Sequence, residues 1–216
     1  MKKYVFFDFD GTLFETGEGI TACVEYALFK MNFPPLSYEE RRTFIGPALY
    51  DSFQLKSGMT PEQSEEAVTL FREKYWDDGY KKSRIYEGIP GLLKKLKENG
   101  ITACVTSAKP GVLVDRILSE NNMQDAFSVR VTADPSVKHS SKAGLIEKTI
   151  EMLGNPDKSE CIMIGDRCFD IDGAKAVGLD SVYCLYGYGT KEEMEECKPS
   201  YFVNEVGELF DLIMRA

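Results

Sequence analysis

The chain has 216 residues, of which 43% are hydrophobic and 28% charged, as in an ordinary globular protein that can bury a core. Its formal charge of −9, from 26 basic and 35 acidic side chains, argues against binding to nucleic acid polymers or anionic membrane surfaces. No run approaches the ~20 apolar residues of a membrane helix, and the six scattered cysteines form no C-x-x-C pair, so we expect a cytoplasmic protein.

The first predicted element is a buried strand over residues 4–7, which leads into Asp8-Phe9-Asp10-Gly11-Thr12. Side chains alternate along a strand, so Asp8 and Asp10 point the same way while the chain stays extended. Two carboxylates beside an apolar strand need a partner, and Mg²⁺ prefers such hard oxygen ligands. The same residues also suit a simple turn, so this pentad needs support from the rest of the chain.

Residues 16–82 are predicted to be helical. An amphipathic stripe runs over residues 17–31 and is stopped by Phe33-Pro34-Pro35. The sequence Thr60-Pro61-Glu62-Gln63 offers an N-cap, a proline at the first helical position and a capping box. This helical part separates the strand and turn over residues 1–13 from an alternating part that begins at about residue 86.

From about residue 86 onward, apolar strands alternate with amphipathic helices. Strands are predicted at 101–105, 127–131, 161–164, 181–185 and 201–203, with helices between them and at the end, while residues 187–198 are left open between a loop and a helix. This alternation predicts an α/β fold with a doubly wound parallel sheet covered on both faces. In such sheets the functional site lies beyond the carboxyl ends of the strands.

Polar residues follow several of these strands. Thr106 and Ser107 come after the strand at 101–105, where a hydroxyl and free backbone N–H groups can hold a phosphate, although Thr106 also suits a helix cap. Lys142 opens a helix, where a cation is unfavourable unless an anion accompanies it; Lys138 is the alternative. Asp166 follows the strand at 161–164, and Asp170, one turn later, either faces the same point or caps the helix.

Taken in chain order, Asp8/Asp10, Thr106, Lys142 and Asp166/Asp170 resemble the four motifs of the haloacid dehalogenase (HAD) superfamily over almost the whole chain. The stretches Phe44-Ile45-Gly46-Pro47, Tyr86-Glu87-Gly88-Ile89-Pro90-Gly91 and Gly165-Asp166-Arg167 are similar to its phosphoglycolate-phosphatase-like branch. In that branch a helical cap is inserted after the first motif. The resemblance thus implies a Rossmann-like HAD core domain over residues 1–14 and 85–216, with a helical cap domain over residues 15–84.

The resemblance also implies an activity, namely Mg²⁺-dependent hydrolysis of a small phosphorylated metabolite through an aspartyl-phosphate. Asp8 is the implied nucleophile and Asp10 the acid and base, while Mg²⁺ is held by the carboxylates of Asp8 and Asp166 and the backbone carbonyl of Asp10. The remaining implied roles are phosphoryl binding by Thr106, Ser107 and Lys142, orientation of Lys142 or of a metal-bound water by Asp170, and substrate contact by Gly46.

Departures from related patterns narrow the activity. Asp10 argues against dehalogenases, which lack this second acid, and Ile20 stands where sugar mutases of the superfamily usually carry a histidine; the single histidine is His139. Phosphoglycolate phosphatase is the first expectation, followed by 5′-nucleotidase or pyrophosphatase and then a mutase. The rivals from other classes are a phospho-accepting receiver domain and a catalytically dead binding domain. Both a monomer and a homodimer stay open.

Overall fold

The computed structural model describes residues 1–133 and 141–216. The chain divides into two compact units, the first made of Met1–Glu15 and Ile85–Ala216 and the second of Thr16–Arg84. A two-stranded sheet of β2 (Phe14–Glu15) and β3 (Arg84–Ile85) lies where the chain passes between the units. From the sequence, the core domain was expected to give way to the helical domain after residue 14. In the structure the first unit extends to Glu15.

The first unit is built on a six-stranded sheet with the order β5-β4-β1-β6-β7-β8. Its paired strands all run parallel. In sheet order they are β5 (Val129–Ala133), β4 (Thr102–Pro110), β1 (Tyr4–Phe7), β6 (Cys161–Gly165), β7 (Asp180–Cys184) and β8 (Tyr201–Val203). The central strands are continuously apolar because both faces of the sheet are covered.

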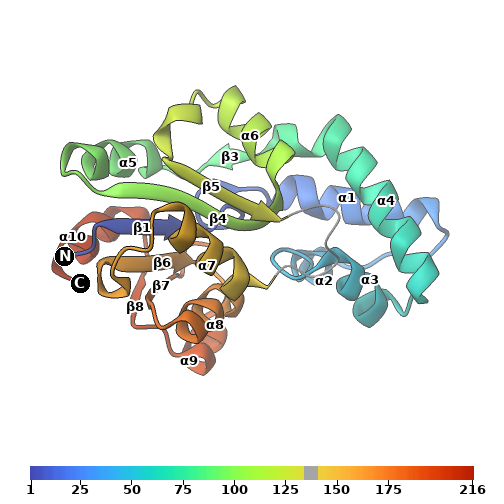
Figure 1. Ribbon diagram of the computed structural model, residues 1–216. Coiled ribbons are helices and arrows are strands. Elements are labelled where there is room, and N and C mark those ends of the chain that lie inside the picture. The colour runs from blue at the N-terminus through green and yellow to red at the C-terminus, as the bar shows by residue number, and fades with distance from the viewer. Residues whose placement is uncertain (134–140) are drawn as a thin grey trace. The chain divides into compact units, whose positions relative to one another are not determined.

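Helices cover both faces of this sheet (Figure 1). One face carries α7 (Lys142–Met152), α8 (Cys168–Val177) and α9 (Lys191–Cys197), and the other carries α5 (Ile89–Glu98) and α6 (Gly111–Glu120), with α10 (Leu209–Arg215) packed on α5. Phe6, Cys104 and Met163 of three adjacent strands pack with Ile146 of α7 and Ala174 of α8. This contact holds α7 and α8 against the centre of the sheet.

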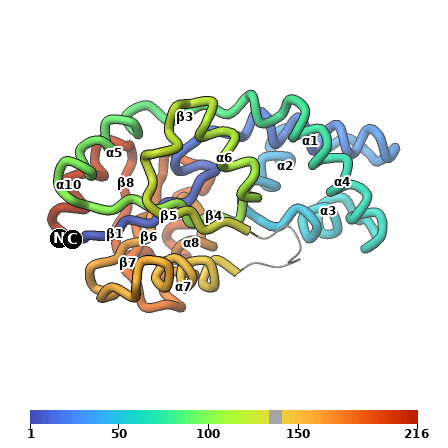
Figure 2. Tube along the Cα trace, turned by 45° about the horizontal axis from the view of Figure 1, so that its top comes forward, coloured from blue at the N-terminus to red at the C-terminus, as the bar shows by residue number. Residues whose placement is uncertain are grey.

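The two ends of the chain meet on this first unit. Figure 2 shows them side by side, and the Met1 amino group donates to the Ala216 carbonyl oxygen at 2.6 Å. Short 3₁₀ turns complete the unit at Gln124–Ala126, Lys158–Glu160 and Val206–Glu208.

The second unit is helical, with α1 (Gly17–Lys30), α2 (Tyr38–Arg42), α3 (Leu49–Ser57), α4 (Pro61–Asp77) and the 3₁₀ turn η1 (Gly79–Lys82). The capping box predicted at Thr60 and Gln63 is formed, and Ser37 and Glu40 form another at α2. Gly19 lies so close to the Gly79 carbonyl that a Cβ would come within 2.2 Å of it. This close approach packs α1 against η1.

The predicted fold class is confirmed, since a doubly wound parallel sheet carries an inserted helical unit. Residues 187–198, which the sequence left open between a loop and a helix, contain α9. β4 runs on to Pro110, five residues beyond the predicted strand end, because its register with β5 shifts between Ser107 and Pro110 and the pairing then resumes. Within the described ranges, no helix combines the length and apolar character that a bilayer span requires.

Candidate active site

Three neighbouring strands bring the predicted site residues to one edge of the sheet. Asp8 directly follows β1, Thr106 and Ser107 belong to the second half of β4, and Asp166 directly follows β6. β1 lies between β4 and β6. The chain runs from β1 through β4 to β5 on one side and then returns to β6 on the other, so this edge is a topological switch point of the kind where α/β proteins bind ligands.

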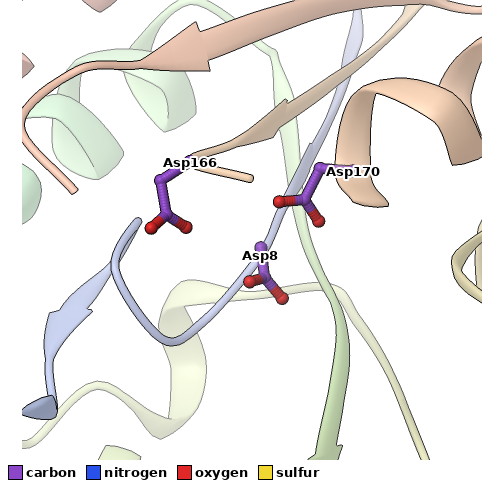
Figure 3. A group of neighbouring side chains, drawn as sticks. All are labelled: Asp8, Asp166 and Asp170. Carbon is purple, nitrogen blue, oxygen red and sulfur yellow. The ribbon is translucent and has the colours of Figure 1, made fainter. Parts of the chain in front are cut away.

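Asp8, Asp166 and Asp170 form a compact group of carboxylates (Figure 3). One carboxylate oxygen from each residue lies within 4.8 Å of the other two. The three residues are 9%, 0% and 1% exposed. They come from three segments, namely the turn after β1, the end of β6 and the first turn of α8, so the predicted convergence of these acids is seen in the structure.

Lys142 joins two of these carboxylates. Its Nζ lies 2.7 Å from Asp8 Oδ1 and 2.8 Å from Asp170 Oδ1, and it also donates to the Thr106 carbonyl oxygen at 3.0 Å. Burial alone lowers the pKa of a lysine, but attraction to Asp170 and Asp8 outweighs burial and raises the pKa of Lys142. The two acids also offset the unfavourable position of a cation at the start of α7.

The charges in this cluster do not balance. Burial, followed by repulsion from Asp170 and Asp8, holds the pKa of Asp166 well above its usual range. Burial also raises the pKa of Asp170 to about 6, although Lys142 pulls in the other direction. Three buried carboxylates facing one ammonium group lack positive charge. Because all their donors are hard oxygens, these residues fit a divalent cation.

Asp166 is held by groups from two other segments. The Thr12 hydroxyl donates to Asp166 Oδ1 at 3.2 Å, and the Tyr188 N–H donates to Oδ2 at 2.8 Å. Gly11 has a φ of +84°, and a Cβ at that position would lie 2.1 Å from Asp166 Oδ2. The turn after β1 and the loop after β7 therefore fix the orientation of this carboxylate, as outer partners do at metal sites.

Asp10 forms a buried ion pair that sequence reasoning missed. Lys109 Nζ lies 2.8 Å from Asp10 Oδ1, with the two side chains 5% and 17% exposed. The same ammonium group lies 5.7 Å from the centre of the Phe9 ring. The register shift of β4 re-aims side chains locally. Strand alternation alone therefore could not predict that Lys109 turns inward.

Thr106 and Ser107 differ in whether the hydroxyl hydrogen is already used in a hydrogen bond within the protein. The Thr149 hydroxyl donates to the Leu145 carbonyl at 2.9 Å, so the 2.9 Å contact between Thr106 and Thr149 uses the hydrogen of Thr106. The Ser107 oxygen instead accepts from the Lys109 N–H at 3.2 Å, which leaves its own hydrogen uncommitted by that contact. Ser107 is therefore the better hydroxyl donor for an anion.

The other predicted site positions lie elsewhere. Gly46, with a φ of +102°, belongs to the turn between α2 and α3 in the second unit. Its substrate contact stays a prediction. Lys138, the alternative to Lys142, lies outside the described residues, as does His139.

Comparison with known proteins identifies the family. The model of the haloacid dehalogenase-like hydrolases matches residues 5–184 of this chain. A 5′-nucleotidase of Pseudomonas aeruginosa is 30% identical over 205 residues, which cover 95% of this chain and 92% of that protein. The tyrosine-protein kinase PtkA of Mycobacterium tuberculosis is 29% identical over 194 residues, which cover 90% of this chain and 66% of the kinase.

Solved structures agree with this result. A crystal structure described as a predicted phosphatase from Clostridium acetobutylicum superposes with a TM-score of 0.94 at 33% identity, and the match covers 100% of both chains. The family match spans most of the chain and contains the described carboxylates, the lysine, all of β4 and β6, and all but the first residue of β1. The chain belongs to the haloacid dehalogenase-like hydrolases and is an enzyme of that family.

Proposed function

We propose that this protein is a Mg²⁺-dependent phosphatase that hydrolyses a small phosphorylated metabolite through a phosphorylated Asp8. The observation that carries the proposal is the buried group of Asp8, Asp166 and Asp170 at the switch point, with Lys142 bonded to two of them. Relatives named 5′-nucleotidase, putative pyrophosphatase and phosphoglycolate phosphatase support the reaction class.

In the first step, a carboxylate oxygen of Asp8 attacks phosphorus and the bond from phosphorus to the leaving alkoxide breaks. Asp10 donates a proton to that alkoxide. In the second step a water attacks the aspartyl-phosphate, Asp10 takes its proton, and the bond to Asp8 breaks to release inorganic phosphate. The 2.7 Å bond from Lys142 to Asp8 Oδ1 holds the nucleophile in one orientation.

Other residues bind the phosphoryl group and the metal. Lys142 and the hydroxyl of Ser107 stabilise phosphoryl oxygens as negative charge spreads over them. Thr106 contributes its carbonyl, which positions Lys142. The carboxylates of Asp8 and Asp166 and the backbone carbonyl of Asp10 would hold Mg²⁺, which offsets the repulsion between an anionic nucleophile and an anionic substrate.

Asp170 and Lys109 act on the reaction through other residues, which they hold in position. Asp170 orients Lys142 through their 2.8 Å ion pair. Lys109 holds the carboxylate of Asp10 by a contact of the same length. Both pairs are buried, so dissolved salt weakens them less than it weakens exposed ion pairs.

We propose that the helical unit is the cap that sets specificity and that Gly46 contacts the substrate. Phosphoglycolate is the substrate expected from the motifs, and a nucleoside 5′-monophosphate is the strongest alternative because of the 5′-nucleotidase relative.

The family match excludes the alternative of a receiver domain. The close grouping of Asp8 and Asp166, together with the ion pair between Lys142 and Asp8, argues against a catalytically dead domain.

The test is phosphate release with and without Mg²⁺ from phosphoglycolate, nucleoside monophosphates, sugar phosphates, pyrophosphate and p-nitrophenyl phosphate. We expect turnover of at least one phosphomonoester that needs Mg²⁺ and stops on chelation. Turnover that is unaffected by removing divalent ions would contradict the metal assignment. Transfer from ATP to protein tyrosine without phosphate release would instead favour a kinase activity like that named for PtkA.

A further inference from the structure

The first turn of α8 carries Asp170, directly after the loop that carries Asp166, and its N–H groups need partners. Asp170 Oδ2 accepts the N–H of Arg167 at 3.2 Å. The next N–H, that of Cys168, is taken by Glu193 Oε1 of α9 at 2.8 Å. A carboxylate from a separate helix thus occupies the start of the helix that holds the site.

Glu193 makes further contacts with the same segment. Arg167 Nε lies 3.0 Å from Oε1 and 3.1 Å from Oε2 of Glu193, so the guanidinium contacts both oxygens. The Cys168 thiol also donates to the Glu193 carbonyl at 3.1 Å. In the first turn of α9, the Glu193 N–H donates to the hydroxyl oxygen of Thr190, the N-cap of that helix, at 3.1 Å. The starts of α8 and α9 are therefore joined by side-chain and backbone contacts together.

We propose that Glu193 is a positioning residue of the active site, which anchors the segment Asp166–Asp170 through Arg167 and the Cys168 N–H. This proposal rests on the proposed Mg²⁺-dependent function of the same site. Glu193 lies beyond residues 5–184, the part of the chain that the family model matches.

Geometry favours positioning over an ordinary surface ion pair. The side chains of Arg167 and Glu193 are 17% and 21% exposed, and the carboxylate completes a helix start as well as pairing a cation. The loop that leads into α9 also supplies the Tyr188 N–H to Asp166 Oδ2 at 2.8 Å. One segment of the chain therefore holds the acid-bearing loop at both Asp166 and Arg167.

The experiment compares Glu193→Ala and Glu193→Gln with wild type, and uses Glu196→Gln as the matched control. Glu196 lies on the same helix and is exposed, so its variant changes the charge alone. Mg²⁺ binding is measured by titration calorimetry, and amide hydrogen exchange is followed over residues 166–170. Turnover of the best substrate is measured at limiting and at saturating Mg²⁺.

We expect Glu193→Ala to weaken Mg²⁺ binding about tenfold, as removal of outer partners does at metal sites. Glu193→Gln, which keeps an oxygen for the Cys168 N–H, should lie between Ala and wild type. Exchange over 166–170 should accelerate in both, and saturating Mg²⁺ should restore most of kcat. Glu196→Gln should behave as wild type.

Unchanged Mg²⁺ binding and unchanged exchange in Glu193→Ala would overturn the proposal, as would an equal effect in Glu196→Gln. A loss of kcat that saturating Mg²⁺ does not restore would also contradict it. A wild type that neither binds Mg²⁺ nor releases phosphate would instead defeat the proposed function. In that case the exchange data alone decide whether Glu193 holds this segment.

Discussion

At the scale of single residues, the hydroxyl groups of Thr106 and Ser107 in β4 make different hydrogen bonds. The Thr106 hydroxyl is turned toward Thr149 of α7, at 2.9 Å, and both residues are fully buried. Ser107 keeps a hydrogen that its contact with the Lys109 N–H does not use. The sequence alone did not separate the two hydroxyl groups, because the partner of the Thr106 hydroxyl lies 43 residues away in the chain.

We therefore predict that Ser107→Ala lowers kcat/KM more than Thr106→Val does. Loss of a donor to a transition-state oxygen costs about 10²–10³ in rate. Thr106→Val should instead cost about 1 kcal/mol of unfolding free energy through the lost hydrogen bond. Steady-state kinetics and urea unfolding of both variants check this. A larger rate loss in Thr106→Val would return the phosphate-binding role to Thr106.

Single-residue patterns predicted that Asp8, Asp166 and Asp170 lie together, but not which groups support them. Asp8, Asp166 and Asp170 come together because each follows a recognisable strand end or opens a helix, which are features of local sequence. Lys109 and Glu193 were missed. The direction of Lys109 depends on the register shift in β4, and Glu193 meets Arg167 only through the packing of α9 beside α8.

At the scale of elements, the turn after β1 is where sequence and geometry agree most closely. Gly11 has a left-handed φ of +84°, and its Cα faces the carboxylate of Asp166. In the same turn the Gly11 N–H donates to the Phe14 carbonyl at 2.8 Å, and Thr12 donates to Asp166. A side chain at position 11 would meet both backbone strain and a proposed metal ligand.

We predict that Gly11→Ala weakens Mg²⁺ binding by at least tenfold, because a Cβ placed 2.1 Å from Asp166 Oδ2 must displace that carboxylate. Gly91→Ala is the matched control, since a Cβ there meets no atom within 4 Å and the position is helical. Calorimetric titration with Mg²⁺ checks both variants. Equal affinities for the two would show that the turn does not position Asp166.

The end of β4 and the presence of α9 could not be predicted from sequence patterns alone. Continuous apolar runs predicted β1 and β6, whereas the extension of β4 to Pro110 needed the pairing of Pro110 with Ala133. Residues 187–198 were left open, and α9 occupies Lys191–Cys197. Its charged sequence carries only a weak apolar stripe, with Met194 and Cys197 buried. The helix is defined by its Thr190 cap and its packing on α8.

At the scale of the whole molecule, the fold class was predictable and the arrangement of the site was partly predictable. Strands that alternate with helices admit few parallel topologies, and a parallel sheet gathers strand ends at one edge. The order β5-β4-β1-β6-β7-β8 then puts β4 and β6 on either side of β1. What the sequence could not show is the charge balance, because that depends on burial and on distances between distant segments.

This charge balance predicts how stability depends on pH and metal. Burial raises the folded-state pKa of Asp170 from 3.8 to about 6, and that of Asp166 rises in the same direction. The folded protein therefore holds these protons more tightly than the unfolded chain. Without metal, the stabilisation is complete below about pH 4 and is lost as pH rises through the folded-state pKa values.

The proposed Mg²⁺ would replace those protons, so it should raise the melting temperature more at about pH 7.5 than at about pH 5, where protons compete with it. Calorimetric scans with and without Mg²⁺ at the two pH values test this. The Asp166→Asn variant should show a much smaller Mg²⁺ effect at both. An equal rise in wild type at both pH values would contradict the raised pKa values of the acid cluster.

We propose that Asp8 carries the phosphoryl group between the two steps of the reaction. The most direct measurement is acid quenching of the Asp10→Asn variant, which lacks the base for the second step, after reaction with Mg²⁺ and p-nitrophenyl phosphate, followed by peptide mass spectrometry. We predict a phosphorylated Asp8 in Asp10→Asn and none in the double variant Asp8→Asn, Asp10→Asn. Phosphate release at the wild-type rate from Asp8→Asn, or a phosphoryl group found only on another residue, would contradict the account.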